Sequence, residues 1–278
     1  MQASILTREA STPTAEPTPA QARVRPLVRL QNITKVYSNG TVALRNLNLD
    51  VQPREFVSLL GPSGCGKSTA LRLVAGLGGH SRGNIDWPTS TYDAHGAPER
   101  EVGFVFQEAT LMPWATVFDN VYLQLRLKDQ PKAKVEGRVR EALDLVGLSA
   151  SADSYPRELS GGMKMRVSIA RALVTQPKLL LMDEPFAALD EITRTKLSND
   201  LLDIWRKANC TIMFVTHSVF ESVYLSTRIV VMAARPGRII GELSIPEPYP
   251  RDVGFRLTPE YSGYCREVSQ LLDTAMKS

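Results

Sequence analysis

The sequence predicts an α/β protein in which a parallel sheet is covered by helices and is interrupted by a helical lobe. One observation is a short apolar strand, EFVSLLG, that runs into a glycine-rich loop and then into a helix, STALRLVAGL. A second is a group of later strands, among them KLLLMDEP and TIMFVTH, whose unbroken apolar runs are typical of strands buried on both faces. The third is a helical pattern between about residues 108 and 165, which separates the first unit from these strands.

The N-terminal part divides into a leader and two strands. Residues 1–26 are rich in Pro, Thr and Ala and contain no apolar signal core, so we expect a disordered leader. From residue 27, LVRLQNITKVY and VALRNLNLDVQ alternate roughly between apolar and polar residues, and the turn signal SNG separates them. In the helix after the glycine-rich loop, a 3.6-residue period places Leu71, Val74 and Leu77 on one side.

Helices dominate the middle of the chain. EVGFVFQ is predicted to be a strand, and the pattern is then mostly helical from Thr116 to Gly147. One helical face there is apolar and consists of Val135, Val139, Leu143 and Val146. A further helix, SGGMKMRVSIARALVTQ, is ended by Pro177.

The C-terminal part returns to alternating strands and helices. EITRTKLSNDLLDIWRKA is an amphipathic helix, and RIVVMAA and RIIGELSI are predicted strands around the turn RPG. Residues 246–278 are expected to form a C-terminal extension whose last segment, YSGYCREVSQLLDTAMKS, is a helix packed on the core. The sequence contains no internal repeats, so we expect one copy of its functional site per chain.

Composition and charge exclude several classes of protein. The formal net charge is +4 and no run of five or more like charges occurs, which argues against a nucleic-acid-binding arm. The three cysteines are widely spaced and form no C-x-x-C motif, so neither disulfides nor a zinc site are expected. No apolar run approaches the roughly 18–20 residues that span a bilayer. We therefore expect the chain to meet a membrane only through a partner.

The glycine-rich loop matches the phosphate-binding pattern G-x-x-x-x-G-K-[ST]. Glycines allow positive φ angles and a close approach of the backbone to a ligand, and the N–H groups at the following helix start bind anionic oxygen. The loop consists of Gly61, Pro62, Ser63, Gly64, Cys65, Gly66, Lys67 and Ser68. Lys67 should reach the β- and γ-phosphates, Ser68 should ligate Mg²⁺, and Thr69 should help at the α-phosphate. Cys65 is interpreted as a small neutral filler, and the predicted substrate is a nucleoside triphosphate.

A second half of the site follows the strand LLLMDEP, which ends in two acids. Asp183 at the strand tip can hold Mg²⁺ through water or Ser68. Backbone alternation turns Glu184 another way, where it can act as general base on an attacking water.

Three further motifs complete a pattern: LSGGM at residues 159–163, ALD at 188–190 and TH at 216–217. Together, and in this order, they closely resemble the ATP-binding subunit of an ABC transporter, over about residues 28–243. The resemblance implies a P-loop NTPase (RecA-like) core with a parallel sheet, an antiparallel β subdomain and a helical subdomain, with the ATP-binding domain at 27–245. It also implies ATP and Mg²⁺ as ligands and ATP hydrolysis coupled to transport.

The resemblance assigns roles to matching residues. Ser160, Gly161 and Gly162 would form a second anion cradle that faces the γ-phosphate held by the opposite subunit, in a head-to-tail dimer of two identical chains. The other matching residues have one role each: Tyr37 stacks on adenine, Gln107 senses Mg²⁺ and the attacking water, Asp190 communicates across the dimer, and His217 contacts the γ-phosphate.

Two residues depart from the family pattern. The signature usually ends in Gln where this sequence has Met163, and Ser218 stands where the family commonly has Asp. Neither is expected to touch the core chemistry, although either could alter rate or regulation.

The resemblance also implies partners. The lack of a membrane span indicates separate permease subunits, and Met112, Pro113 and Trp114 in ATLMPWATVFDNV are expected to form part of a groove for them, while Leu111 and Val117 pack locally. FQEATLMPWATVFDNV, EPFAALDEITR and RPGRI resemble the importer branch for nitrate, sulfonates and taurine, which implies a solute-binding protein and a place on the cytoplasmic face of the inner membrane.

Three alternatives stay open at this point. An exporter cassette would differ in its permease. A soluble ABC ATPase acting on nucleic acid or ribosomes would need a coiled-coil insertion, a second cassette or a more basic charge. A regulatory subunit that binds ATP without hydrolysis would lack some of the hydrolytic residues, all of which are present here.

Overall fold

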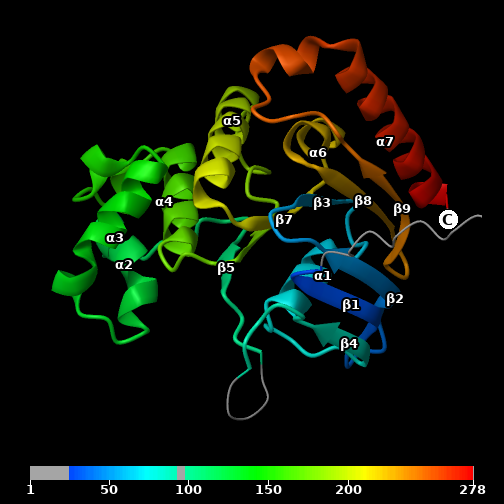
Figure 1. The fold of residues 1–278 in the computed structure, drawn as a ribbon, viewed down its shortest axis with the longest axis horizontal. Coiled ribbons are helices and arrows are strands. Elements are labelled where there is room, and N and C mark those ends of the chain that lie inside the picture. The colour runs from blue at the N-terminus through cyan, green and yellow to red at the C-terminus, as the bar shows by residue number, and fades with distance from the viewer. Residues whose placement is uncertain (1–24, 93–97, 278) are drawn as a thin grey trace, which may run out of the picture.

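The computed structural model describes residues 25–92 and 98–277. The leader predicted for residues 1–26 therefore lies, apart from its last two residues, outside the described residues. Figure 1 shows the parallel sheet at the centre, the helical lobe to one side of it, a small β-sheet below, and a long C-terminal helix along the opposite side.

The large sheet carries the order β5-β6-β7-β3-β8-β9 within the described ranges. Its first five strands run parallel, and β9 pairs antiparallel with β8. The parallel sheet predicted from the unbroken apolar runs is thus confirmed, and every residue of β3, β6 and β7 is buried. The strands are β3 (Phe56–Leu60), β5 (Val102–Val105), β6 (Leu179–Asp183), β7 (Thr211–Thr216), β8 (Arg228–Ala233) and β9 (Arg238–Ser244).

The small sheet is antiparallel, with the order β2-β1-β4. Its strands are β1 (Val28–Val36), β2 (Val42–Val51) and β4 (Arg82–Asp86). Alternation indicated β1 and β2, but it did not indicate β4. The β4 sequence RGNID has no apolar alternation and is mostly exposed, so it forms only because β1 offers an edge to pair with.

Helix α1 (Lys67–Val74) follows the glycine-rich loop and packs between the two sheets. The sequence predicted a helix that carries Leu77 on the same side as Leu71 and Val74, but the helix is shorter than predicted. The helix ends at Val74, Gly76 takes a left-handed φ of 74°, and Leu77 is 60% exposed. A left-handed glycine is a common stop for a helix, and it turns the following residues away from the buried face.

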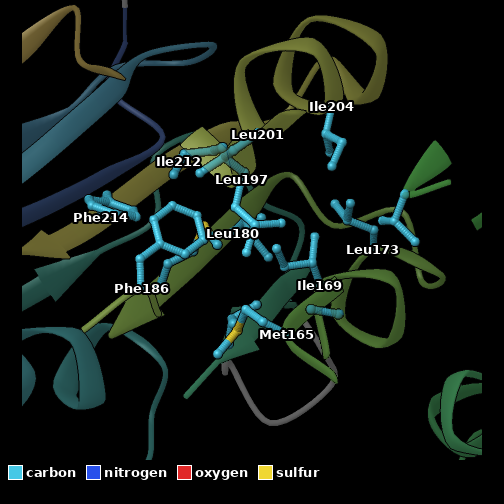
Figure 2. Close-up of a cluster of buried hydrophobic side chains, with 14 of the residues drawn as sticks. Met165, Ile169, Leu173, Leu180, Phe186, Leu197, Leu201, Ile204, Ile212 and Phe214 are labelled. Carbon is cyan, nitrogen blue, oxygen red and sulfur yellow. The ribbon is translucent and has the colours of Figure 1, made fainter. Parts of the chain in front are cut away.

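The helical lobe contains α2 (Val117–Arg126), α3 (Lys132–Leu145), two short 3₁₀ turns (Ser149–Ser151 and Pro156–Glu158) and α4 (Gly161–Leu173). The apolar face predicted for Val135, Val139, Leu143 and Val146 is buried, as expected. Helix α4 attaches the lobe to the sheet: its Met165, Ile169 and Leu173 meet side chains from β6, α5 and β7 in one core cluster (Figure 2).

The remaining helices are α5 (Glu191–Ala208), α6 (Val219–Leu225), a 3₁₀ turn (Val253–Leu257) and α7 (Pro259–Lys277). Helix α5 matches the predicted amphipathic segment, whereas the short α6 was not predicted. Helix α7 packs against α6, β8 and β9, so the extension lies on the core (Figure 1). None of the helices in the described part of the chain has both the length and the apolar composition that crossing a bilayer requires.

Candidate functional site

The phosphate loop lies at the carboxyl end of β3, at an edge of the sheet where the parallel strands β3, β6 and β7 all end. Gly66 closes the loop with a φ of 91°, a conformation that residues with a Cβ rarely adopt, and it caps α1 without any side chain. The first N–H groups of α1 are therefore not satisfied by a capping side chain. Lys67, Ser68 and Thr69, the first residues of α1, line the pocket over the loop, where such N–H groups can bind an anion.

Lys67 is the cation of this loop, and its side chain is 4% exposed. Its ammonium donates hydrogen bonds to the carbonyl oxygens of Gly61 at 2.8 Å and Pro62 at 3.1 Å. Glu184 Oε1 lies 3.8 Å from the same nitrogen. A buried charge is costly without such partners, and this set holds the lysine at the floor of the pocket.

Ser68 and Asp183 come together as the sequence predicted for a magnesium site. The Ser68 hydroxyl donates to Asp183 Oδ1 at 2.7 Å, and the Asp183 side chain is 7% exposed. Within residues 25–92 and 98–277, no group of three or more His, Cys, Asp or Glu side chains could hold a metal alone. A hydroxyl paired with one carboxylate fits Mg²⁺, which binds few protein oxygens and completes its shell with phosphates and water.

Glu184 and His217 form the second contact pair. The Nδ1 atom of His217 lies 3.1 Å from Glu184 Oε2. Strands β6 and β7 are adjacent and parallel, so Glu184 after β6 and His217 after β7 reach the same edge of the sheet. Glu184 has a φ of 45°, and its carboxylate contacts Lys67 and His217, whereas the Asp183 carboxylate contacts Ser68. Two neighbouring acids thus have separate partners, as different roles require.

A pocket of about 430 Å³ lies over the loop. Tyr37, predicted to stack on adenine, lines it, is 42% exposed, and has its hydroxyl 3.2 Å from Thr69 Oγ1. The complete lining consists of Tyr37, Thr41, Val42, Ala43, Ser63, Gly64, Cys65, Gly66, Lys67, Ser68, Thr69, Glu184 and Arg235. Cys65 is fully buried, and burial raises the pKa of its thiol, which agrees with a neutral filler.

Other candidate residues lie outside this pocket. Gln107 is exposed two residues beyond β5, the strand next to β6, and so it stands at the same edge of the sheet. Ser160, Gly161 and Gly162 start α4 in the helical lobe, where the Ser160 hydroxyl accepts a hydrogen bond from the Met163 N–H at 3.3 Å. None of these four residues lines the pocket over the chain's own phosphate loop.

Asp190 caps α5, and its carboxylate accepts a hydrogen bond from the Thr193 N–H at 2.9 Å. This bond favours the ionised form and lowers the pKa of Asp190. Ser218 caps α6 in the same way, accepting from the Glu221 N–H at 3.3 Å. Serine and aspartate are both good N-caps, so the Ser218 departure leaves this helix start intact.

Sequence reasoning missed four of the lining residues: Thr41, Val42 and Ala43 at the start of β2, and the charged residue Arg235. The available signal for Arg235 was the RPG turn between two predicted strands, but nothing in the sequence says that this turn returns to the phosphate loop. Gly237, two residues on, hydrogen-bonds with β2: its N–H donates to the Ala43 carbonyl at 3.0 Å, and its carbonyl accepts from the Arg45 N–H at 2.9 Å.

The fold and this pocket define a phosphate-loop nucleotide-binding ATPase. The sequence model of the family described as ABC transporter matches residues 44–187. The chain is 45% identical over 260 residues to an uncharacterised ABC transporter ATP-binding protein of Methanocaldococcus jannaschii, with 92% of this chain and 95% of that protein covered. It is also 45% identical to the aliphatic sulfonates import ATP-binding protein SsuB of Bacillus subtilis, with 81% and 85% covered.

Solved structures agree with this assignment. A dimeric ATP-binding cassette bound to ADP and Pi matches with a TM-score of 0.67 and 32% identity, over 80% of this chain and all of that one. The protein cbiO1 of Clostridium perfringens, part of an ABC transporter complex, matches with a TM-score of 0.73 and 27% identity, over 87% and 99%. The chain belongs to the ABC transporter family as an ATP-binding subunit, an ATP hydrolase coupled to transport.

Proposed function

We propose that this chain powers the import of sulfonates or similar small anions through a separate permease. The observation that carries the proposal is the similarity to aliphatic sulfonates import ATP-binding proteins of several Bacillus species, at 44–45% identity. The branch-specific segments of the sequence, including the loop after Gln107 and the RPG turn, point the same way.

ATP binding is proposed to use the pocket over the phosphate loop. The loop N–H groups and Lys67 hold the β- and γ-phosphates, Thr69 helps at the α-phosphate, and Tyr37 stacks on adenine. When bound, Mg²⁺ would be held by Ser68 and Asp183, with Gln107 as a further ligand, and would neutralise charge on the phosphates.

Hydrolysis is proposed to depend on the contact pair at the sheet edge. Glu184 accepts the proton of the attacking water, and His217, 3.1 Å away, holds that carboxylate in place and reaches the γ-phosphate. Lys67 leaves its loop carbonyl oxygens and balances negative charge on the γ-phosphate as the bond to the leaving oxygen breaks.

A second copy of the chain is proposed to complete each site. The signature residues Ser160, Gly161 and Gly162 begin a helix, so their N–H groups can donate hydrogen bonds to an anion. They do not line the pocket over the phosphate loop of their own chain. A head-to-tail pair with twofold symmetry would place each signature loop over the partner's ATP, with Asp190 near the shared boundary.

The permease is proposed to bind at the loop before α2. Trp114 in this loop is 77% exposed, an unusual position for a large aromatic side chain. The buried Asn120 side chain of α2 holds this loop by hydrogen bonds. It accepts from the Met112 N–H and donates to the carbonyl oxygens of Met112, Ala115 and Thr116. A preorganised loop binds a partner with less loss of entropy. The chain would then lie peripherally on the cytoplasmic face of the inner membrane, and a solute-binding protein would deliver the cargo.

The experiment is to reconstitute the chain with its permease and solute-binding protein in liposomes and to measure ATP hydrolysis with candidate solutes. We expect a sulfonate, taurine or nitrate on the binding protein's side to raise turnover and to accumulate inside. Trp114→Ala should remove this stimulation, whereas Leu127→Ala, which alters another exposed apolar residue of the lobe, should retain it. Transport in the opposite direction, or stimulation by none of these anions, would contradict the proposal.

A further inference from the structure

Arg235 stands in the nucleotide pocket without a partner of its own. It lines the pocket together with Tyr37 and the phosphate loop, and its side chain is exposed. Across residues 25–92 and 98–277, no hydrogen bond or ion pair engages its guanidinium, whereas Arg228, earlier on the same β8–β9 hairpin, binds Glu55 and Glu242. Arg235 thus presents uncommitted donors at the mouth of an anion site.

The backbone under Arg235 is tightly constrained. Arg235 has a φ of 56°, an uncommon conformation for a residue with a long side chain. Two residues later, a Cβ on Gly237 would lie 2.2 Å from the Cys65 carbonyl oxygen and 2.6 Å from that of Ala43, so only glycine fits. The turn is therefore pressed against both the phosphate loop and β2. Residues held in sparsely populated conformations by their surroundings concentrate at functional sites.

The charge distribution of the pocket makes a second cation useful. Among the described residues that line it, the cations are Lys67 and Arg235, and Glu184 is an anion. Lys67 is buried at the floor, where its ammonium is shared between loop carbonyl oxygens and Glu184. A bound triphosphate would carry several negative charges and would meet Lys67 only from one side. Arginine at the rim can donate two parallel hydrogen bonds to a phosphate from the solvent side.

We propose that Arg235 is a nucleotide-binding residue that clamps the phosphate chain of ATP from the rim of the pocket that Lys67 also lines. This inference rests on the proposed nucleotide site and adds a residue to it. The phosphates are the inferred target because a guanidinium pairs with anionic oxygens and because the turn packs on the phosphate loop through Gly237 and Cys65.

The experiment measures dissociation constants for ATP, ADP, AMP and adenosine by calorimetry at low salt. Arg235→Ala should weaken ATP binding about tenfold, the effect of one charge-assisted hydrogen bond at a partly exposed site. The loss should shrink from ATP to AMP, should vanish for adenosine, and should diminish as salt is raised. In ATPase assays KM should rise more than kcat falls, because the contact is already made in the ground state.

Three variants make the test decisive. Arg266→Ala removes an exposed arginine on α7 and should bind ATP normally. Arg235→Gln keeps the side-chain stem and should reproduce the phosphate-dependent loss even if the alanine variant melts at a lower temperature. Lys67→Ala should abolish binding.

The outcomes separate the two proposals. If Lys67→Ala no longer binds ATP while both Arg235 variants bind ATP as tightly as Arg266→Ala does, the Arg235 inference is wrong. The assignment of the nucleotide site to the phosphate loop is then retained. If adenosine binding falls as much as ATP binding, the contact is with the nucleoside and the inference is overturned. If Lys67→Ala binds ATP normally, the site assignment fails and the Arg235 inference fails with it.

Discussion

Glu184 shows how a single backbone conformation separates two neighbouring acids. Its φ of 45° is uncommon for a residue with a side chain, and it directs the carboxylate toward Lys67 and His217 while Asp183 points to Ser68. Regular β alternation would also send two neighbouring side chains to opposite faces. Here the strand has already ended, and the left-handed turn keeps both carboxylates at the edge of the sheet where a nucleotide can reach them.

Replacing Glu184 by Gln should leave ATP binding nearly intact and should lower turnover by about 10²–10⁴-fold, since the amide cannot accept a proton from water. Without hydrolysis to separate the chains, ATP should trap a dimer. Gel filtration with and without ATP, together with phosphate release, measures both effects. Glu267→Gln, an exposed site on α7, is the matched control. Turnover at the ordinary rate in Glu184→Gln would remove this residue from the role of general base.

Helices α4, α5 and α6 each begin at a candidate functional segment and carry a side-chain cap. Ser160, Asp190 and Ser218 cap α4, α5 and α6, and each accepts a hydrogen bond from the N–H three residues on. The cap fixes the loop that precedes it, because the capping side chain and the helix start are joined. Loops that must meet a ligand or a second chain are thereby attached to rigid elements.

The helical lobe should depend for its stability on the buried face of α3. Leu143 is fully buried among α2, α3 and α4, and truncating such a leucine to alanine costs about 2–5 kcal/mol. Leu143→Ala should therefore lower the melting temperature clearly. Leu127→Ala, at a site that is 68% exposed, should change it little. Calorimetry of both variants checks this, and equal melting temperatures would mean that the lobe does not unfold together with the rest.

For the whole molecule, the separation of the signature loop from the phosphate loop matters more than any single contact. The signature loop starts α4 in the helical lobe, while the phosphate loop lies at the sheet edge, and the two share no pocket. One chain would therefore offer two half-sites. In the proposed head-to-tail dimer, twofold pairing would join unlike halves and would create two complete sites per dimer.

Mixing two inactive variants tests this arrangement. Lys67→Ala should remove ATP binding from a chain's own loop, and Ser160→Arg should block its signature loop with a bulky cation. Each variant alone should be inactive. A random mixture contains about half mixed dimers, each with one intact site, so activity should return to about a quarter of the unaltered level. A mixture as inactive as its components would contradict composite sites.

Local motifs account for what could be predicted. The phosphate loop, the acidic strand end and the buried strands depend on residues within about ten positions of one another, so their chemistry and periodicity are visible in one dimension. Strand β4 and helix α6 were not predicted, because their sequences carry weak periodic patterns. Both elements depend on contacts with neighbouring elements of the fold. Leu77 was misplaced because a glycine stop overrode helical periodicity.

The sequence by itself determined the fold class, the order of most elements apart from β4 and α6, and the nature of the substrate, because spacing and residue type suffice for these. Only the tertiary structure decided which distant residues meet. Chain segments more than a hundred residues apart bring Ser68 to Asp183 and the turn at Arg235 to the phosphate loop. Such contacts depend on strand order and on the packing of turns, which no local pattern records.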